Sequence, residues 1–547
     1  MAFGTLVSDM ILHNGAIWCG MDDGQCQAVA IWQGKILATG TDAQILALRG
    51  PQTKVIDLQG RFASPGLNDD HLHLIMLGLT MDWVDASPDV VPTLAILQDA
   101  LRKRAATTPK GEWIMARGYD QVKLDIGRHP DRSELDAASP DHPVLLVRAC
   151  GHVAIANSLA MSNAGIDENT PVPSGGLIEK INGRLTGLFA ETAQDMMRSQ
   201  LPDPTVEQQI AAIERAGNYL LSMGITSCMD AAVGMVAGMS EICAYHLAKR
   251  DGKLPVRVWQ VLLGDPDRSV VAECHAAGLV SGVGDDWLRV GAVKLFLDGS
   301  AGGRTAWMSA PYLPGSDQRN DNIGVQILPD EQLEQLVSDY HGMGYQMACH
   351  AIGDAAIGQL ITAYEKALVA MPDPERRHRI EHCGFSTAPQ HQRMLSAGIY
   401  PVPQQAFIYD FGDSYISVLG QERALPSYPI RTWRDLGFKP GTGSDAPVCK
   451  PLPWPNLYTM ITRKTWKGTV MDARQCLTPA EALQAYTEYG AFSQKAEAVK
   501  GRLVAGQLAD IAVFSRNLLA ADPEDILHDT HCVMTIVDGR VVYEHAV

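Results

Sequence analysis

Eight apolar strand candidates run through the middle of this chain, and helical stretches separate most of them. In chain order they are RFASPGLNDDHLHL, MGITSCMDAA, VRVWQVLLG, VGAVKLFLDGS, YQMACHAIGD, RHRIEHCG, GIYPVPQQ and KPGTGSDAPV. The stretches between them include amphipathic segments such as DEQLEQLVSDYHGMG. Eight strands with helical crossovers are the count of a (β/α)8 or TIM barrel. We therefore predict an α/β fold with such a barrel over residues 63–498.

The spacing of these strands is uneven at one place. The first candidate ends near Leu74 and the second begins near Met223, a gap that is too long for one helix. We predict an insertion domain over residues 75–215, with a strand candidate of its own in PVLLVRACGHVAIAN. Because the insertion leaves the carboxyl end of a barrel strand, where barrel active sites lie, it should cover the barrel mouth.

Both ends of the chain have an antiparallel β pattern. Short apolar runs cut by Gly, Asn and Asp fill residues 10–57, and the stretch from Gly501 onward looks the same. Neither end alone is large enough to bury a sheet face. We predict that residues 1–62 and 499–547 combine into one small β-sandwich.

Charge and cysteine content exclude several kinds of partner and site. The chain has 45 Lys and Arg against 62 Asp and Glu, a net charge of −17 that would repel phosphate backbones and anionic lipid. It shows no signal-peptide pattern and no apolar run that approaches about 18 residues. We therefore expect a cytoplasmic protein with no nucleic-acid or membrane partner. Eleven scattered cysteines without a C-x-x-C pair indicate reduced thiols, not a thiolate zinc site.

Imidazoles and a carboxylate stand at the ends of the predicted barrel strands. His71 and His73 end the first strand, where alternation points residues i and i+2 the same way. His350, His382 and Asp445 end the fifth, sixth and eighth candidates. The carboxyl ends of barrel strands meet at one mouth, and this donor set suits zinc or a similar divalent ion. The alternative is a group of separate core histidines.

Lys294 lies at the end of the fourth strand candidate, on the same face as Phe296 and Asp298. A lysine in a barrel mouth is costly unless it is paired or modified. Three states stay open from the sequence. They are an ion pair with Asp298, a free ammonium that positions substrate, and a carbamate formed with carbon dioxide that bridges two metal ions.

The motifs PGLNDDHLH, KLFLDGS, CHAIGD, RIEH and GSDAP, flanked by a split β-sandwich, resemble those of the amidohydrolase superfamily. GHVAIANS, TGLFAE, AIGDAA and RIEHC resemble its amidohydrolase-3 branch, which includes N-substituted formamide deformylases. The resemblance covers nearly the whole chain. Asn68 departs from it, since the family usually has an apolar residue there. The metal ligands that it implies are His71, His73, carboxylated Lys294, His350, His382 and Asp445.

The resemblance implies metal-dependent hydrolysis of a carbon–nitrogen bond, in a small, apolar or aromatic N-substituted amide. One or two divalent ions, with zinc expected, would activate a water molecule to hydroxide and polarise the carbonyl. Asp445 would be the general base and then the general acid. His152, in GHVAIANS, could donate to the developing oxyanion, or it could pack inside the insertion.

Further side chains are candidates for contact with the substrate. Those chosen by residue type and place are Trp83, Arg117, Tyr119, Asn157, Arg304 and Phe407. Additional aromatic wall candidates are Trp113, Trp307, Tyr409 and Trp454, and additional candidates for carboxylate capture are Arg148 and Arg431. Glu191 lies in TGLFAE, but its residue type indicates no role. Asp354 is expected to cap the helix after the fifth strand.

Two other functions compete with amide hydrolysis. A mononuclear deaminase would need the histidines and the final aspartate but not Lys294, so this lysine argues against it. A non-catalytic metal-binding regulatory protein should have lost ligands, and none is missing. The expected partner is a small-molecule amide, and a homodimer is the assembly considered.

Overall fold

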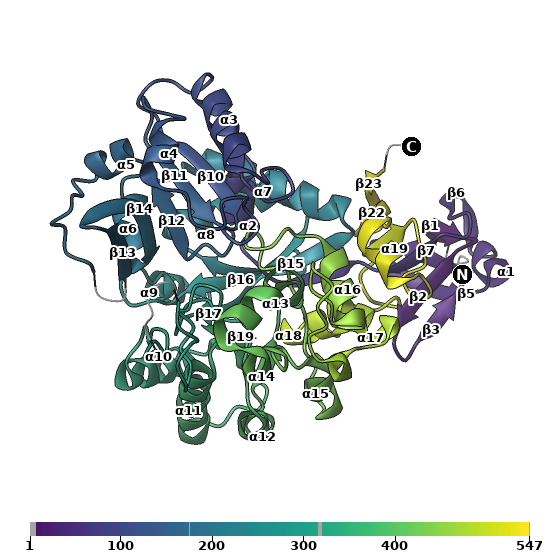
Figure 1. Cartoon of the computed structure of the whole chain (residues 1–547). Coiled ribbons are helices and arrows are strands. Elements are labelled where there is room, and N and C mark those ends of the chain that lie inside the picture. The colour runs from purple at the N-terminus through teal and green to yellow at the C-terminus, as the bar shows by residue number, and fades with distance from the viewer. Residues whose placement is uncertain (1–6, 174–175, 316–319, 546–547) are drawn as a thin grey trace.

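Seven parallel strands form the central sheet of the computed structural model, which describes residues 7–173, 176–315 and 320–545 (Figure 1). Their order is β20-β19-β18-β17-β16-β15-β8, and almost every residue in them is buried. Near-continuous apolar strands are typical of a parallel sheet that is covered on both sides. Their bounds are β8 (Leu67–Leu72), β15 (Ile225–Val233), β16 (Arg257–Leu263), β17 (Leu288–Lys294), β18 (Gln346–Ala351), β19 (Arg379–His382) and β20 (Tyr400–Val402).

The eighth predicted strand, over 439–448, is not a regular strand, but its backbone follows β8. The amide of Asp445 donates to the His71 carbonyl at 2.7 Å, and the His73 amide donates to the Ala446 carbonyl at 2.7 Å. The segment approaches β8 too closely for a side chain, since a Cβ on Gly443 would lie 2.4 Å from the His71 nitrogen. The sheet is thus a nearly closed, barrel-like sheet of seven strands, with this segment beside β8.

The first predicted strand, over 61–74, is divided between two sheets. Its first part, β7 (Phe62–Pro65), pairs with strands from both ends of the chain, whereas β8 enters the barrel. Gly66 lies at the junction, where a Cβ would come within 2.2 Å of the Thr226 hydroxyl. A glycine is therefore required where the chain passes from one sheet to the other.

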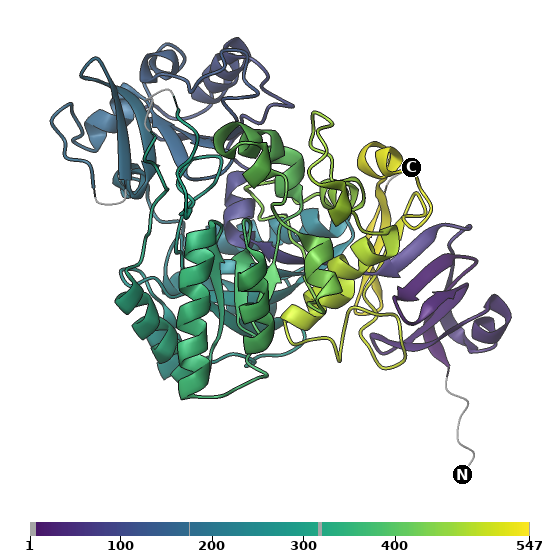
Figure 2. The same ribbon diagram turned by 60° about the horizontal axis from the view of Figure 1, so that its bottom comes forward.

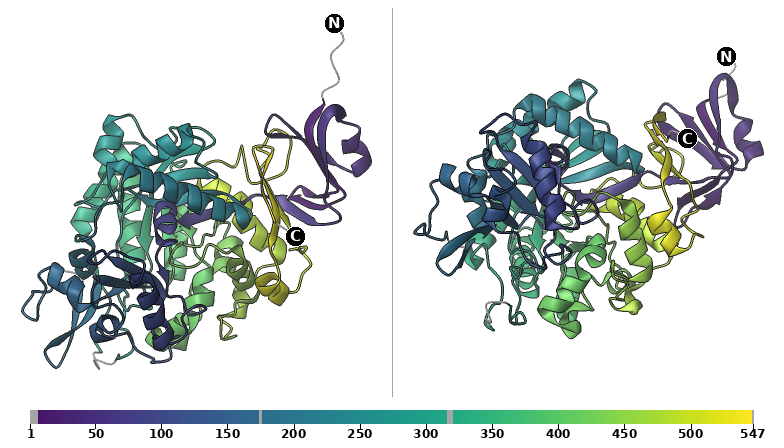
Figure 3. Two further views of the ribbon diagram at one scale, coloured as in Figure 1. Left: turned by 90° about the horizontal axis from the view of Figure 1, so that it is seen from above. Right: turned by 45° about the horizontal axis from the view of Figure 1, so that its top comes forward.

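The two ends of the chain pack together beside the barrel (Figures 1 and 3). One sheet has the order β5-β4-β1-β6 and the other β23-β22-β21-β7-β2-β3. Leu12, Ile31 and Val513 belong to one apolar core that both sheets share. The bounds are β1 (Ser8–His13), β2 (Ala16–Gly20), β3 (Gly24–Cys26), β4 (Ala28–Trp32), β5 (Lys35–Gly40), β6 (Arg49–Asp57), β21 (Ile511–Phe514), β22 (Cys532–Val537) and β23 (Arg540–Glu544).

A fourth, mixed sheet interrupts the barrel between β8 and β15 (Figure 2). Its order is β13-β14-β12-β11-β10-β9. The single strand predicted over 143–157 is two antiparallel strands, β11 and β12, joined by a turn that contains Gly151 at φ +78. The bounds are β9 (Val84–Asp85), β10 (Ile114–Tyr119), β11 (Val144–Arg148), β12 (Val153–Ala156), β13 (Gly176–Ile181) and β14 (Arg184–Glu191).

Helices connect the strands and cover the barrel, and α10 coincides with the amphipathic segment DEQLEQLVSDYHG. None of the described helices has the length and apolar content needed to cross a membrane. The α-helices are α1 (Asp42–Leu46), α2 (Leu74–Thr80), α3 (Leu94–Ala105), α4 (Arg132–Asp136), α5 (Ser158–Asn163), α6 (Asp195–Arg198), α7 (Val206–Ser222), α8 (Met239–Arg250), α9 (Val271–Ala276), α10 (Asp330–Gly342), α11 (Asp354–Ala370), α12 (Ala388–Ala397), α13 (Ala406–Leu419), α14 (Gln421–Ala424), α15 (Ile430–Asp435), α16 (Pro453–Thr462), α17 (Pro479–Gln484), α18 (Gly490–Ser493) and α19 (Pro523–His528). Shorter turns are the 3-10 helices η1 (Thr192–Gln194) and η2 (Ala473–Gln475) and the π-helix η3 (Ala485–Tyr489).

Candidate active site

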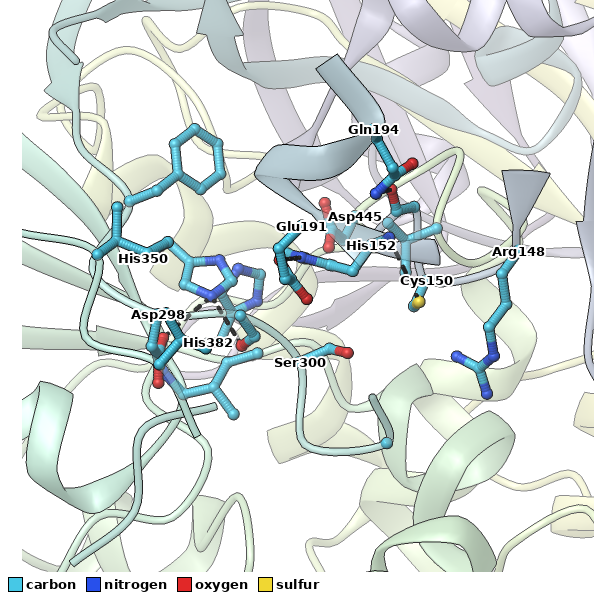
Figure 4. Close-up of a pocket in the computed structure, with 18 of the residues that line it drawn as sticks. Arg148, Cys150, His152, Glu191, Gln194, Asp298, Ser300, His350, His382 and Asp445 are labelled. Atoms are coloured by element: carbon cyan, nitrogen blue, oxygen red, sulfur yellow. Dashed lines mark hydrogen bonds and ion pairs between the residues drawn. The ribbon is translucent and has the colours of Figure 1, made fainter. Parts of the chain in front are cut away.

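A cavity of about 430 Å³ lies between the barrel mouth and the mixed sheet (Figure 4). The barrel and the loops after its strands contribute His73, Lys294, Phe296, Asp298, His350, His382, Phe407 and Asp445 to its wall. The mixed sheet and its turns contribute Arg117, Arg148, Cys150, His152 and Glu191. Residues far apart in the sequence therefore share one chamber, and the mixed sheet forms part of its wall.

Three of the predicted ligands come together as a group that could hold a metal ion. One ligand atom each from His71, His382 and Asp445 lies within 4.8 Å of the others. The Asp445 carboxylate is also 3.3 Å from Nε2 of His73 and 3.5 Å from Nε2 of His71. His73 therefore lies beside the group, as its alternation with His71 predicts.

Several polar atoms of this group are buried without a hydrogen-bond partner in the part of the chain that the structure describes. They are Nε2 of His71, Nδ1 of His73, Oδ1 of Asp445 and Nζ of Lys294. Unpaired buried polar atoms cost free energy unless an ion or water satisfies them. Two imidazole nitrogens and a carboxylate oxygen are the donors that zinc and similar ions take in proteins, so these residues fit a divalent metal.

The protonation states suit metal binding. Burial, with help from the charge of Lys294, lowers the pKa of His71 to about 4, and burial lowers the pKa of His382 well below its usual value. Both rings are therefore neutral at pH 7, as metal ligation requires. Burial acts to raise the pKa of Asp445, but the nearby Nε2 of His73, 3.3 Å away, and the charge of Lys294 lower it to about 2. Asp445 is thus ionised.

A buried network of charged side chains contacts His71 on the side of its ring that faces away from Asp445. Nδ1 of His71 faces the Glu381 carboxylate, and Arg379 donates two hydrogen bonds to that carboxylate at 2.7 and 3.0 Å. Arg379 also pairs with Asp70 at 3.2 Å. A carboxylate on Nδ1 fixes the tautomer in which Nε2 is free to bind metal. We did not predict this role for Glu381, because its contact with His71 depends on how β19 and β8 pack across the barrel.

His382 is oriented in a similar way by Gln404, which the sequence did not reveal, and by Phe407, which was expected only to contact the substrate. Its Nδ1 lies 2.5 Å from the Gln404 amide oxygen, and its ring stacks on Phe407 with centroids 5.7 Å apart. The backbones of His382 and Asp445 have positive φ angles of 68° and 55°. Such sparsely populated conformations gather at functional sites, where the surrounding structure maintains them.

His350 is close to the group but is turned partly away from it. Its ring centroid is 4.4 Å from that of His382, while its Nε2 lies 3.2 Å from the Asp298 carboxylate and 3.2 Å from the Gly299 carbonyl. Only its Nδ1 could therefore meet an ion in this orientation. Asp298 also accepts main-chain hydrogen bonds from Trp307, Ile352 and Gly353, so it anchors the loops after two barrel strands.

Lys294 lines the cavity but forms no ion pair with Asp298. Its side chain is 1 % exposed, and Nζ has no hydrogen-bond partner among the described residues. Nζ lies 4.7 Å from the centre of the Phe296 ring. Burial lowers the pKa of this amine, although Glu381 and Asp445 oppose the effect. The ion pair with Asp298, one of the three states open from the sequence, is not formed because Asp298 binds His350 and main-chain amides instead.

His152 faces the cavity from the turn between β11 and β12 and forms an ion pair with Glu191. The two side chains are 2.8 Å apart, and the other oxygen of Glu191, Oε1, is buried with no hydrogen-bond partner within the described ranges. Burial acts to lower the pKa of His152, but the Glu191 charge and hydrogen bond raise it to about 9. His152 is therefore cationic at neutral pH. Its ring centroid lies 6.1 Å from that of His350.

Of the six substrate candidates, two line this cavity and four do not. Arg117 and Phe407 line the cavity. Tyr119 is buried and pairs with His129, and Asn157 caps α5 through the Ala160 amide, so their polar atoms serve the fold. Arg304 donates to the Leu313 carbonyl, outside the cavity wall.

The remaining candidates also have other roles or places. Trp83, Tyr409 and Trp454 line a second cavity of about 880 Å³. Arg148 pairs with Asp120 at 3.5 Å, and Arg431 pairs with Glu481 at 2.5 Å. Trp113 packs against the core of the mixed sheet, and Trp307 packs against the barrel core. Asp354 does not cap its own helix, because Gly353 is the N-cap and Asp354 accepts the Ser309 amide.

Comparison with known proteins identifies the family. Residues 54–543 match the amidohydrolase family in its amidohydrolase-3 form. The chain belongs to the amidohydrolase family. It is 31% identical to the putative amidohydrolase YtcJ of Bacillus subtilis strain 168, over 98% of this chain and 99% of that protein. It is 27% identical to an N-substituted formamide deformylase of Arthrobacter pascens, over 99% of each chain.

A solved structure supports the same assignment. An uncharacterised metal-dependent hydrolase from Pyrococcus horikoshii OT3 is 26% identical to this amidohydrolase, with a TM-score of 0.75, and the match covers 94% of this chain and 99% of that one. Together with the group of His71, His382 and Asp445, these likenesses mark the protein as a metal-dependent hydrolase of the amidohydrolase family.

Proposed function

We propose that this protein hydrolyses the carbon–nitrogen bond of a small N-substituted amide that has an apolar or aromatic part. The observation that carries the proposal is the set of buried, unpaired ligand atoms of His71, His73 and Asp445 beside the cavity. The name of the Arthrobacter pascens relative supports the bond type, because that protein acts on N-substituted formamides.

In this proposal one or two divalent ions, zinc first among them, bind at the mouth of the barrel. The residues that would hold them are His71, His73, Lys294 as a carbamate, His350, His382 and Asp445. A bound ion would lower the pKa of a water ligand and polarise the scissile carbonyl. Lys294 suits the carbamate role because its amine is buried, unpaired and placed among acidic and imidazole ligands.

The chain's own groups then provide proton transfer and charge stabilisation. Asp445 is ionised, so its carboxylate can accept the proton of the attacking water and pass it to the leaving nitrogen. His152 is cationic and can donate a hydrogen bond to the carbonyl oxygen as negative charge develops there. Glu191 keeps the His152 ring oriented and protonated, which gives this glutamate the role that the sequence did not indicate.

The cavity wall supports an apolar substrate part. Phe296, Phe407 and Phe411 line it together with Ile327 and Val448. Aromatic and aliphatic side chains with a few placed polar groups are the usual composition of a small-molecule site. We infer that the ring or alkyl group of the substrate lies against this wall while the amide faces Asp445.

Metal analysis and hydrolysis assays test the proposal together. Purified protein should contain about one or two equivalents of a divalent metal, and chelation should abolish hydrolysis of N-formyl-2-phenylethylamine or its N-acetyl and N-benzoyl analogues. Adding zinc or manganese back should restore the activity. Full activity after complete chelation would contradict the metal role, and a metal-loaded protein that cleaves none of these amides would contradict the substrate class.

A further inference from the structure

Arg117, on β10, is a buried arginine in the cavity wall that lacks an acidic partner. It is 9 % exposed and lines the cavity that contains Asp445 and Lys294. Its hydrogen bonds go to main-chain carbonyls only, from Nε to Pro447 at 3.3 Å and from one terminal nitrogen to Ala149 at 3.2 Å. No carboxylate of the described residues lies within ion-pair distance of it. A buried cation is costly unless a counter-charge reaches it.

The other arginines of this cavity differ from Arg117. Arg148 is paired with Asp120 at 3.5 Å and bonded to Gln121 at 2.6 Å. Arg198 and Arg268 are exposed, and Arg198 donates to the Gly151 carbonyl and to Gln194. Among the described residues, Arg117 is therefore the arginine of this wall that is both buried and without an anionic partner. Burial lowers its pKa to about 10, so it still carries its charge at neutral pH.

The place of Arg117 gives a small molecule access to it. Pro447, which accepts its Nε, is two residues from Asp445 on the segment beside β8. Arg117 also lines the second cavity, of about 880 Å³, and so do Phe411, Pro447 and Val448. The guanidinium thus lies where the two cavities meet, close to the group that would bind metal.

We propose that Arg117 binds a carboxylate of the substrate, so that the natural substrate is an amide with an acid group near the scissile bond, as in an N-acyl amino acid. Arginine suits this task because its planar guanidinium can donate two parallel hydrogen bonds to a carboxylate. The inference rests on the proposed amide hydrolysis, but the binding of a carboxylate can be measured without turnover.

A matched pair of amides tests the specificity. N-formyl-phenylalanine and N-formyl-2-phenylethylamine differ only in the carboxylate, so their ratio of kcat/KM measures its contribution. We expect wild type to prefer the acid, and Arg117→Met to lower the ratio by at least about tenfold, because a hydrogen bond to a charged group is lost. An unchanged ratio in this variant would overturn the proposal.

Arg463 supplies the matched control. It is fully buried, donates to the main-chain carbonyls of Ser427, Tyr428 and Met471, and has a pKa that burial lowers to about 10, but it does not line the cavity. Arg463→Met should therefore lower thermal stability, because its buried hydrogen bonds are lost. It should not change the ratio of kcat/KM between the two substrates. An equal change of the ratio in both variants would show that Arg117 only stabilises the fold.

Calorimetry separates this inference from the proposed function. Wild type should bind 3-phenylpropanoate at least about tenfold more tightly than 3-phenylpropanamide, and Arg117→Met should remove that difference. Binding that survives Arg117→Met but disappears on chelation would place the carboxylate on the metal and overturn the inference. Arginine-dependent binding in a protein that cleaves no amide would overturn the proposed hydrolysis alone.

Arg117→Lys is the second variant in case Arg117→Met does not fold. It keeps the charge but loses the paired donors, so it should still weaken the preference for 3-phenylpropanoate over the amide. A full preference in this variant would count against the inference.

Discussion

Replacing Glu381 by glutamine tests whether the network behind His71 controls metal binding. Glu381 is fully buried, faces Nδ1 of His71 and accepts two hydrogen bonds from Arg379. The Gln side chain keeps the shape and one acceptor oxygen but removes the charge. Partners of this kind typically contribute a factor of about 10–100 to metal affinity. We expect the metal affinity to fall by about 10-fold in Glu381→Gln. In Glu381→Ala, which also loses the hydrogen bond, we expect a fall of about 100-fold.

The same change should destabilise the fold, because it leaves Arg379 with Asp70 as its remaining acidic partner in the described structure. Removing one partner of a buried ion pair costs about 3–5 kcal/mol. Metal affinity is measured by competition with a chromophoric chelator at a temperature where the variant is folded, and stability by thermal unfolding of the metal-free protein. Glu481→Gln is the control, since Glu481 pairs with Arg431 and Arg434 away from the cavity. A Glu381→Gln protein with reduced stability and wild-type metal affinity would refute the reasoning.

Three further predictions concern the groups inside the cavity. Asp445→Asn should lower kcat by at least about 10²-fold with only a modest loss of bound metal, since the shape stays and the base is removed; near-normal turnover would exclude the proton-transfer role. Lys294→Ala should lose most activity and regain part of it with added acetate or propionate, and a crystal structure of the metal-loaded protein with a bare amine at Lys294 would contradict the carbamate. The kcat of wild type should fall above about pH 9, where His152 loses its proton. In Glu191→Gln this fall should begin at a lower pH, because the carboxylate that keeps His152 protonated is removed. A fall at the same pH in both proteins would show that His152 is not the group that must be protonated.

The parts of the fold that the sequence predicts well are those where local pattern and burial agree. Strands β15, β16 and β18 are buried along their whole length, so their apolar runs stand out in the sequence. The segment over 439–448 has two prolines and two close-approach glycines instead of such a run, and its contact with β8 depends on tertiary packing. The hairpin of β11 and β12 was predicted as one strand because its turn contains only one glycine and no proline.

The residues of the candidate site also differ in how well the sequence predicts them. His71, His382 and Asp445 could be predicted because the ends of barrel strands converge whatever the sequence between them. Their supporting residues could not, since Glu381 meets His71 across the barrel, and Gln404 meets His382 from the loop after β20. Aromatic and amide side chains were assigned too freely to substrate, because Tyr119 and Asn157 have residue types that serve a core or a helix cap equally well.

The two walls of the cavity carry different tasks. The barrel supplies the grouped ligand atoms, held by carboxylates and amides of its own strands. The mixed sheet supplies His152, Glu191 and Arg117, which line the cavity from the other side. Substitutions on the mixed sheet should therefore change which amide is bound while metal binding stays intact.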